Sequence, residues 1–212
     1  PIVMGHRIDI LSTGAGLTGD KEDHTPITRP APRPVTEGLQ VGRIPSHIAV
    51  NAVWNGDHAL WNRSIGAEVN PTSFLSMIAI MPTNRGAIQS PPVVGNGRIF
   101  TTDAQGVVRA WTWPGMKQIW SRQTAPKKSR STNIGGGSAI DGDTLYVVDG
   151  VAQTVALDVA TGKIKWAVDL GTPGRSAPTI AGGLVVFGTI DERLIALEAT
   201  TGRQVWSYQA TA

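Results

Sequence analysis

The feature that most constrains the fold of this chain is a short motif that occurs twice with the same internal spacing. It reads Ala-Leu-Asp-Val-Ala-Thr-Gly-Lys-Ile-Lys-Trp at residues 156–166 and Ala-Leu-Glu-Ala-Thr-Thr-Gly-Arg-Gln-Val-Trp at residues 196–206, so that Trp166 and Trp206 are 40 residues apart. A third copy, altered in its turn, ends at Trp120, 46 residues before Trp166. Repeats of this length are typical of propeller blades and of some helical solenoids. The chain is therefore predicted to be a repeat array.

The content of each repeat favours β-structure over helix. Every copy reads as four short apolar or β-branched strands separated by turns, and no apolar stripe of helical period continues over three turns. A four-stranded unit predicts one blade, and the blades are expected at about Ser90–Thr124, Gly136–Leu170 and Ser176–Gln209. The predicted fold class is all-β, a β-propeller of four-stranded antiparallel blades, with about three blades and a tail strand in this chain.

The part of the chain before the first complete blade is predicted to have two regions. Residues 1–35 are expected to form an N-terminal strand and a Pro-rich strap, and residues 36–212 the partial propeller. Residues 61–66 resemble residues 166–171, so the array is expected to begin on the last strand of an otherwise missing blade. Three blades and a tail are too few to close a ring, since propellers typically have about 4 to 8 blades. The remaining blades are expected from the rest of a longer protein or from another chain.

The tryptophan that ends each motif is predicted to be structural. It follows the Thr-Gly turn by four residues, which places it on the outermost strand of its blade. There an indole can be buried against the neighbouring blade while its N–H finds an acceptor. This structural interpretation is preferred to stacking on a ligand. The expected docking residues are Trp61, Trp120, Trp166 and Trp206.

Composition and charge exclude several classes of function. The chain is 41% hydrophobic and 17% charged, with a net charge of +3 and a pI near 9.5, which is too weakly basic to predict nucleic-acid binding. Cysteine is absent, so disulfides, thiolate metal sites and a cysteine nucleophile are excluded. The longest apolar run, Phe74–Met81, is shorter than the roughly 20 residues of a membrane span. Pro1 is not an initiator methionine, which leaves a processed or trimmed start open.

Three local patterns could indicate a cofactor, metal or catalytic site, but none has the required context. Residues 14–19 match the dinucleotide fingerprint, yet charged residues and prolines follow where a helix is needed. Asp141-Gly142-Asp143 lacks the remaining ligands of a calcium loop and is better explained as a turn. The histidines have no spacing that places two on one face: His6, His24, His47 and His58. No catalytic residue, cofactor or metal site is predicted.

The two full motifs resemble the repeats of pyrroloquinoline-quinone-type propellers. Two branches share these repeats: the quinoprotein dehydrogenases, and the outer-membrane protein assembly factor BamB-like proteins, which have the fold without the cofactor. The second branch is favoured by the absence of an adjacent cysteine pair and by three segments that resemble it: Gly5–Leu11 with the Pro-rich strap after it, Trp61–Gly66 and Gly174–Thr179.

This resemblance carries implications that the residues alone do not. It implies an eight-bladed ring and a non-enzymatic periplasmic lipoprotein scaffold, associated with the outer membrane and without a cofactor. Its implied partner is the outer-membrane barrel-assembly subunit, bound at its periplasmic domains through propeller loops. The alternative is a fragment of a pyrroloquinoline-quinone-dependent dehydrogenase.

The resemblance also indicates a partner-binding loop. The family pattern Leu-x-Leu-Arg precedes Gly-x-Ser-Ala-Pro, and only Leu170 of this chain matches it. Leu170 is the expected apolar anchor and Arg175 the charged flank, with Thr172 and Pro173 between them. A basic loop between the first two blades is the second candidate, since a mobile basic loop can steer an acidic surface: Lys127, Lys128 and Arg130.

Overall fold

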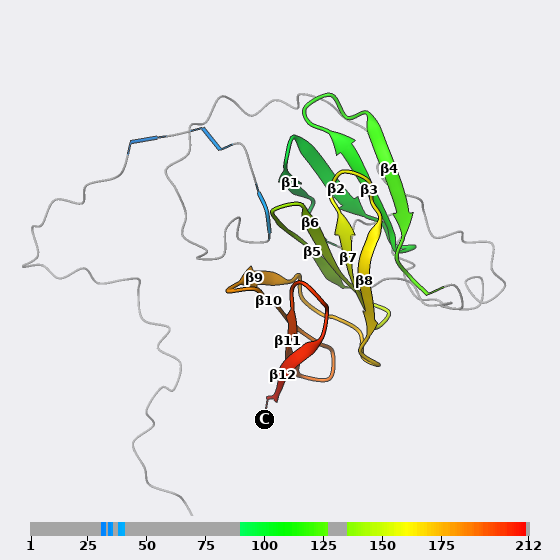
Figure 1. Cartoon of the computed structure of the whole chain (residues 1–212), viewed down its shortest axis with the longest axis vertical. Helices are drawn as coiled ribbons and strands as arrows, with labels where there is room; N and C mark the ends of the chain where they lie inside the picture. Colours follow the sequence, from blue (N-terminus) through cyan, green and yellow to red (C-terminus); the bar gives the residue numbers. More distant parts are fainter. Residues whose placement is uncertain (1–30, 33, 36–37, 41–89, 127–134, 211–212) are drawn as a thin grey trace, which may run out of the picture.

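A computed structural model describes residues 31–32, 34–35, 38–40, 90–126 and 135–210 of the chain. These residues form three four-stranded antiparallel sheets and no helix (Figure 1), and none of them belongs to a helix that could cross a membrane. The first sheet comprises β1 (Val93–Gly95), β2 (Arg98–Thr102), β3 (Val107–Thr112) and β4 (Gln118–Gln123). The second comprises β5 (Gly136–Asp141), β6 (Thr144–Asp149), β7 (Gln153–Asp158) and β8 (Ile164–Asp169). The third comprises β9 (Thr179–Ala181), β10 (Leu184–Gly188), β11 (Arg193–Glu198) and β12 (Gln204–Gln209).

Each sheet is a meander in which every strand pairs with the next along the chain. The first hairpin of each sheet turns on residues with positive φ, among them Gly97, Gly142 and Gly182. The third hairpin carries a register shift at the same repeat position in all three sheets, after Ala110, Ala156 and Ala196 respectively. Repeated topology and a repeated irregularity identify these sheets as blades, so the predicted all-β propeller fold class is confirmed.

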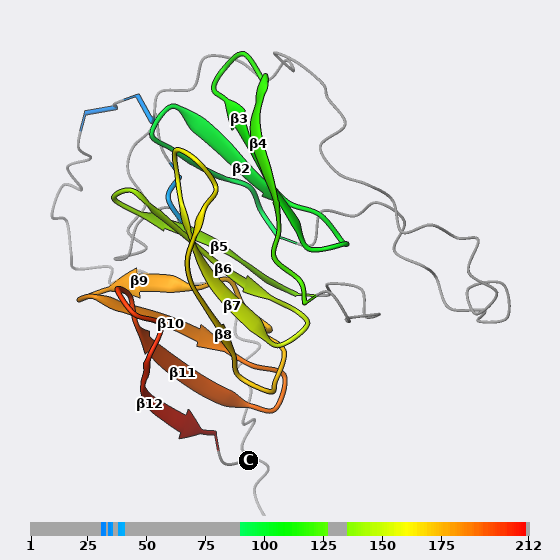
Figure 2. The ribbon, with the colours of Figure 1, turned by 45° about the vertical axis from the view of Figure 1, so that its right-hand side comes forward.

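The sheets stack one after another, and the middle sheet is covered on both faces (Figure 2). Strand β6 shows this directly, because all of its residues are buried. Leu145 and Val147 belong to the apolar cluster shared with the first sheet, whereas Tyr146 and Val148 belong to the cluster shared with the third. Successive side chains of a strand point to opposite faces, so a continuous apolar run serves two cores.

The spacing between glycine and tryptophan is the same in the two full motifs, and contacts from one sheet to the next explain it. Trp120 Nε1 donates to Val159 O at 3.0 Å, and Trp166 Nε1 donates to Ala199 O at 2.9 Å. Each indole also lies over the glycine of the next Thr-Gly turn. A Cβ on Gly162 would be 2.7 Å from the Trp120 ring, and one on Gly202 would be 2.6 Å from the Trp166 ring. Both glycines have positive φ as well, so no other residue fits without strain.

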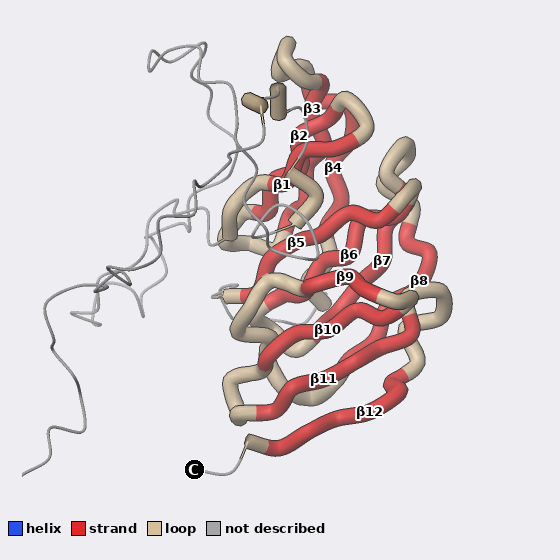
Figure 3. The backbone as a smooth tube through the Cα atoms, turned by 90° about the vertical axis from the view of Figure 1, so that its left-hand side faces the viewer, coloured by secondary structure: helices blue, strands red, loops and turns tan. Residues whose placement is uncertain are grey.

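The expectation that all the motif tryptophans are largely buried is wrong for Trp206, which is 39% exposed. The third sheet is the last one in the described part of the chain, and β12 forms its outer edge (Figure 3). Trp206 therefore has no following Thr-Gly turn to cover it there. All residues of β12 are exposed, in contrast to β6.

The altered turn of the first motif copy keeps the backbone conformation of the others. Met116 stands at the repeat position of Gly162 and has a φ of 51°, although methionine rarely adopts a positive φ. Its side chain is 4% exposed and packs with Ile99 and Trp111. The buried side chain offers a compensation that glycine lacks, which explains how the repeat tolerates the change.

Several sequence expectations lie outside the described residues. They concern the N-terminal strand, most of the Pro-rich strap, the pattern at residues 14–19, the tail at Trp61–Gly66 and the four histidines. The boundary between residues 1–35 and 36–212 stays a prediction.

Candidate protein-interaction surface

The connections between sheets lie at one end of the blades, together with the hairpins β2–β3, β6–β7 and β10–β11. The loop from Leu170 to Pro178 joins β8 to β9 and contains the predicted partner-binding residues. The candidate basic residues Lys127, Lys128 and Arg130 follow β4 in the sequence and lie outside the described residues. The topology thus assigns the Leu170–Pro178 loop to this end of the blades.

The loop that begins at Leu170 is held by main-chain hydrogen bonds to two sheets. Gly174 N donates to Asp149 O of the second sheet at 3.1 Å, and Arg175 N donates to Gly188 O of the third at 2.8 Å. Pro173 O accepts from Ile190 N at 3.1 Å. A Cβ on Gly174 would lie 2.1 Å from Val148 Cγ1. Only glycine at position 174 therefore allows the loop to lie this close to the second sheet. The loop is a fixed bridge between blades.

The predicted contact residues in this loop differ in how much surface they present. Leu170 is half-buried and packs against the apolar cluster between the second and third sheets. Thr172 is 6% exposed and Pro173 is half-buried. Arg175 is exposed, and its guanidinium forms no hydrogen bond or ion pair with the described residues. Leu170 therefore offers less contact area than an exposed anchor would, and Arg175 is the accessible charged group of the loop.

An ion pair lies on the hairpin that the loop contacts. Arg193 Nη2 is 2.7 Å from Asp191 Oδ2, and both side chains are partly exposed. The hydrogen bond from the Arg193 side chain, followed by that from Thr189, lowers the pKa of Asp191 to about 2. Asp191 is thus ionised and already paired at neutral pH. Arg175, in contrast, has a charged group that is free to contact a partner.

Sequence reasoning missed a buried carboxylate beneath the loop. Asp149 is 1% exposed, and its Oδ1 accepts from Val151 N at 2.9 Å and from Gln153 N at 2.8 Å. Its Oδ2 is buried and has no hydrogen-bond partner among the described residues. Burial is the main reason that the pKa of Asp149 is raised to about 6.

The same repeat position in the first sheet explains why Asp149 is unusual. There Asp103 makes the matching main-chain contacts and also pairs with Arg109, whose Nη1 is 2.5 Å from Asp103 Oδ2. The repeat position of Arg109 in the second sheet is Val155, which is buried and apolar. Aligning the repeats on these positions would have revealed the missing counter-ion.

The Asp141–Asp143 turn can be compared with a metal site within the described part of the chain. That part contains no group of three or more His, Asp or Glu side chains placed to hold a metal ion. Asp143 of the predicted turn is instead paired with Lys165, whose Nζ is 2.9 Å from Asp143 Oδ1. The hydrogen bond from Lys165, more than that from Thr144, lowers the pKa of Asp143.

Comparison with known proteins finds two kinds of relative. A family model described as outer membrane protein assembly factor BamB matches residues 104–212. The chain is 25% identical over 126 residues to outer membrane protein assembly factor BamB of Moranella endobia, covering 57% of this chain and 32% of that protein. It is 40% identical over 89 residues to the dehydrogenase subunit of the quinone alcohol dehydrogenase of Gluconobacter oxydans, covering 36% of this chain and 12% of that one.

The fold is shared with a solved structure. BamB from Moraxella catarrhalis superimposes with a TM-score of 0.50 at 21% identity, over 58% of this chain and 36% of that one. An identity this low shows the fold alone. The chain spans about a third, or less, of the length of each of these proteins.

Proposed function

The chain belongs to the family described as outer membrane protein assembly factor BamB, and from that membership we propose that it is a non-enzymatic scaffold of the machinery that assembles outer-membrane β-barrels. Its place is the periplasm, at the outer membrane, to which a lipid anchor would hold it. Its partner is the barrel-assembly subunit, bound through that subunit's periplasmic domains. The curated relative's name states outer-membrane protein assembly of that protein, and the proposal extends this role to the chain.

One observation supports the loop Gly171–Arg175 as the docking element. Its backbone is bonded to two sheets, while the charge of Arg175 stays exposed and unpaired within the described structure. A rigid frame that presents a free charge loses little conformational entropy on binding. The other end of the sheets offers mainly tight hairpin turns.

The test is a pull-down of the barrel-assembly subunit with the Arg175→Glu variant. A charge reversal at a contact is expected to weaken binding by roughly tenfold or more. Lys163→Glu is the matched control, because Lys163 is an exposed cation in the Thr-Gly turn at the opposite end of the second sheet. Equal binding by Arg175→Glu and the parent would refute the loop as the docking site. Leu170→Asp is unsuitable as a first test, since it places a carboxylate against the apolar cluster.

The basic residues Lys127, Lys128 and Arg130 are proposed as a second, steering contact. Charges at the rim of an interface raise the association rate more than the final affinity. Replacing all three by Gln should slow association at low salt and leave the dissociation rate nearly unchanged. An unchanged association rate at low salt would remove them from the interface.

A fragment of a quinone-dependent dehydrogenase is the second candidate, favoured by the 40% identity to the Gluconobacter oxydans subunit. The described residues contain no cluster of carboxylates placed to hold a metal ion. Fluorescence titration with pyrroloquinoline quinone and calcium distinguishes the two. Micromolar binding would favour the dehydrogenase, and its absence together with retained partner binding would favour the scaffold.

A further inference from the structure

The innermost strands of the three blades present one equivalent edge amide each. Val94 of β1, Ile140 of β5 and Ile180 of β9 are 46 and 40 residues apart, which is the spacing of the repeats. All three amides donate to one short stretch of chain, residues 38–40, called here the inner segment. The bond from Val94 N to Gly38 O is 2.8 Å, that from Ile140 N to Leu39 O is 2.6 Å, and that from Ile180 N to Gln40 Oε1 is 3.2 Å.

The inner segment thus crosses the blades with one residue for each. Gly38 also donates its own N–H to Val94 O at 2.9 Å, which makes a two-bond antiparallel bridge. This is the way in which an added strand pairs with a free sheet edge. The register of one residue to one blade arises because the three strands come close together at the inner side of the array.

Side chains of the inner segment fill specific places. Leu39 packs into the apolar cluster between the first two sheets. A Cβ on Gly95 would lie 2.8 Å from Leu39 Cδ2, so the glycine of β1 makes room for this leucine. Gln40 is 4% exposed. A Cβ on Gly38 would have no atom of the described residues within 4 Å, so the first position has room for a Cβ.

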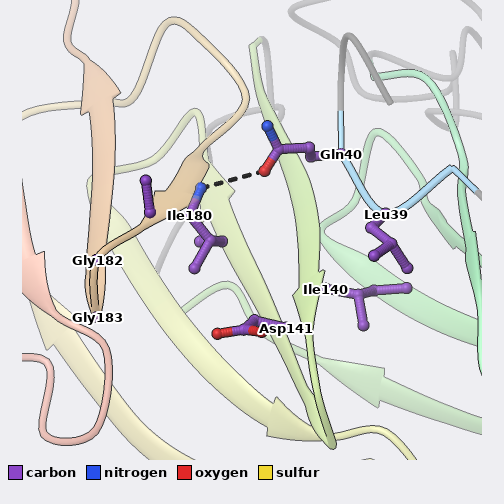
Figure 4. A pocket seen from close by; sticks show the side chains of 8 residues that line it. Leu39, Gln40, Ile140, Asp141, Ile180, Gly182 and Gly183 are labelled. Carbon is purple, nitrogen blue, oxygen red and sulfur yellow. Dashed lines mark hydrogen bonds between the residues drawn. The ribbon is translucent and has the colours of Figure 1, made fainter. Parts of the chain in front are cut away.

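The contact surface continues beyond the inner segment as a cavity. It has a volume of about 460 Å³ and is lined by residues that include Leu39, Gln40, Ile140, Asp141 and Ile180 (Figure 4). The amide oxygen of Gln40 faces Ile180 N, while Gln40 Nε2 is buried without a partner among the described residues. The Gln40 Nε2 donor and the partly apolar cavity therefore remain available beside the third blade.

We propose that the inner edges of the three blades form a binding site for an extended peptide, and that residues 38–40 occupy this site in cis. The ligand is a strand-like segment whose second residue is leucine or a similar aliphatic and whose third carries a side-chain acceptor, while its first need not be glycine. Main-chain carbonyls supply the acceptors for the first two amides. When the third residue is glutamine, as in the inner segment, the cavity takes a further group that accepts from its Nε2. The site does not depend on the proposed partner loop, which lies at another surface of the blades.

The experiment releases the inner segment from the site by mutation and then adds a peptide that can bind in its place. In the full chain, Leu39→Asp is expected to speed amide hydrogen exchange at Ile140 and Ile180 by roughly tenfold or more, because the edge bonds open locally. The amide of Val147, inside the ladder of β6, is the internal control and should not change. A synthetic peptide with the sequence of residues 35–43 should then restore slow exchange at both positions, whereas the same peptide carrying Asp in place of Leu39 should not.

A milder variant keeps the test decisive if Leu39→Asp does not fold. Gln40→Ala should speed exchange at Ile180 alone and leave Val94 protected, since only the third contact uses this side chain. Unchanged exchange at Ile180 in Gln40→Ala, or equal restoration by both peptides in Leu39→Asp, would overturn the proposal.

Discussion

At the scale of single residues, Gly202 combines two constraints that can be separated by mutation. Its φ is 74°, and a Cβ there would lie 2.6 Å from the Trp166 ring. Gly182 has a φ of 57° but open space around its Cβ position. Gly182→Ala should therefore cost about 1 to 2 kcal/mol for the left-handed backbone alone, and Gly202→Ala a further 1 to 3 kcal/mol or so for overpacking. Urea unfolding of both variants measures the difference, and equal costs would mean that the indole contact is not tight.

Asp149 predicts a distinctive dependence of stability on pH. Its pKa in the folded protein, about 6, lies above the ordinary value of 3.8, so the folded state holds this proton more tightly than the unfolded state. Stability from this group is present below about pH 4 and is lost as the pH rises through 6. The free energy of unfolding of Asp149→Asn, relative to the parent, should thus rise by roughly 2 kcal/mol between pH 4 and pH 7. Denaturant titrations at several pH values test it, and a flat difference would contradict it.

Asp103→Asn is the matched control for that prediction. Asp103 occupies the same repeat position but has Arg109 as its partner. Removing the charge leaves a partly buried guanidinium without its counter-ion, which should cost about 1 to 3 kcal/mol at pH 7. The two substitutions are therefore expected to change stability in opposite directions at neutral pH.

At the scale of elements, the tryptophan of one sheet fastens the next, and two positions of the same motif allow the effect to be measured. Trp166 reaches Ala199 O in the third sheet, whereas Trp206 is 39% exposed. Trp166→Ala is expected to cost roughly 3 to 5 kcal/mol as a core truncation, and Trp206→Ala less than about 1 kcal/mol as a surface change. Comparable shifts in chemical unfolding for the two variants would show that the contact between sheets contributes little.

At the scale of the whole molecule, one face of the third sheet is apolar and has no neighbour in the described structure. Tyr208 is 62% exposed, Leu194 is 41% exposed, and the two form a cross-strand pair. An exposed apolar sheet face promotes association. The 212-residue chain by itself should therefore self-associate at micromolar concentration, in sedimentation experiments read against its mass of 22.4 kDa.

The matched variant for this association is the double substitution Leu194→Lys and Tyr208→Glu. It replaces an apolar cross-strand pair by one of opposite charge, which preserves strand pairing. The variant should sediment as a monomer at the concentration where the parent associates. A monomeric parent, or an associating variant with intact circular dichroism, would exclude this face.

The local architecture of the protein is encoded in its amino-acid sequence. The spacing between Trp166 and Trp206 predicted the repeat, and apolar strands punctuated by Thr-Gly and glycine turns predicted four strands per unit. Such features are encoded within one repeat, because strand period and turn chemistry depend on neighbours along the chain. Pairing between consecutive strands follows from the same short connections, so the sheets required no information from distant residues.

The contacts between blades, in contrast, depend on how the sheets pack in three dimensions. Leu39 and Gln40 contact Ile140 and Ile180 because of the way the surfaces pack together. The same packing leaves Leu170 half-buried and Trp206 exposed, and it buries the carboxylate of Asp149. Each of these environments is formed by residues that are far apart in the sequence. How deeply a side chain is buried, and what that burial costs a charged or polar group, depends on its neighbours in space. The residue type at one position therefore cannot specify how deeply that residue is buried.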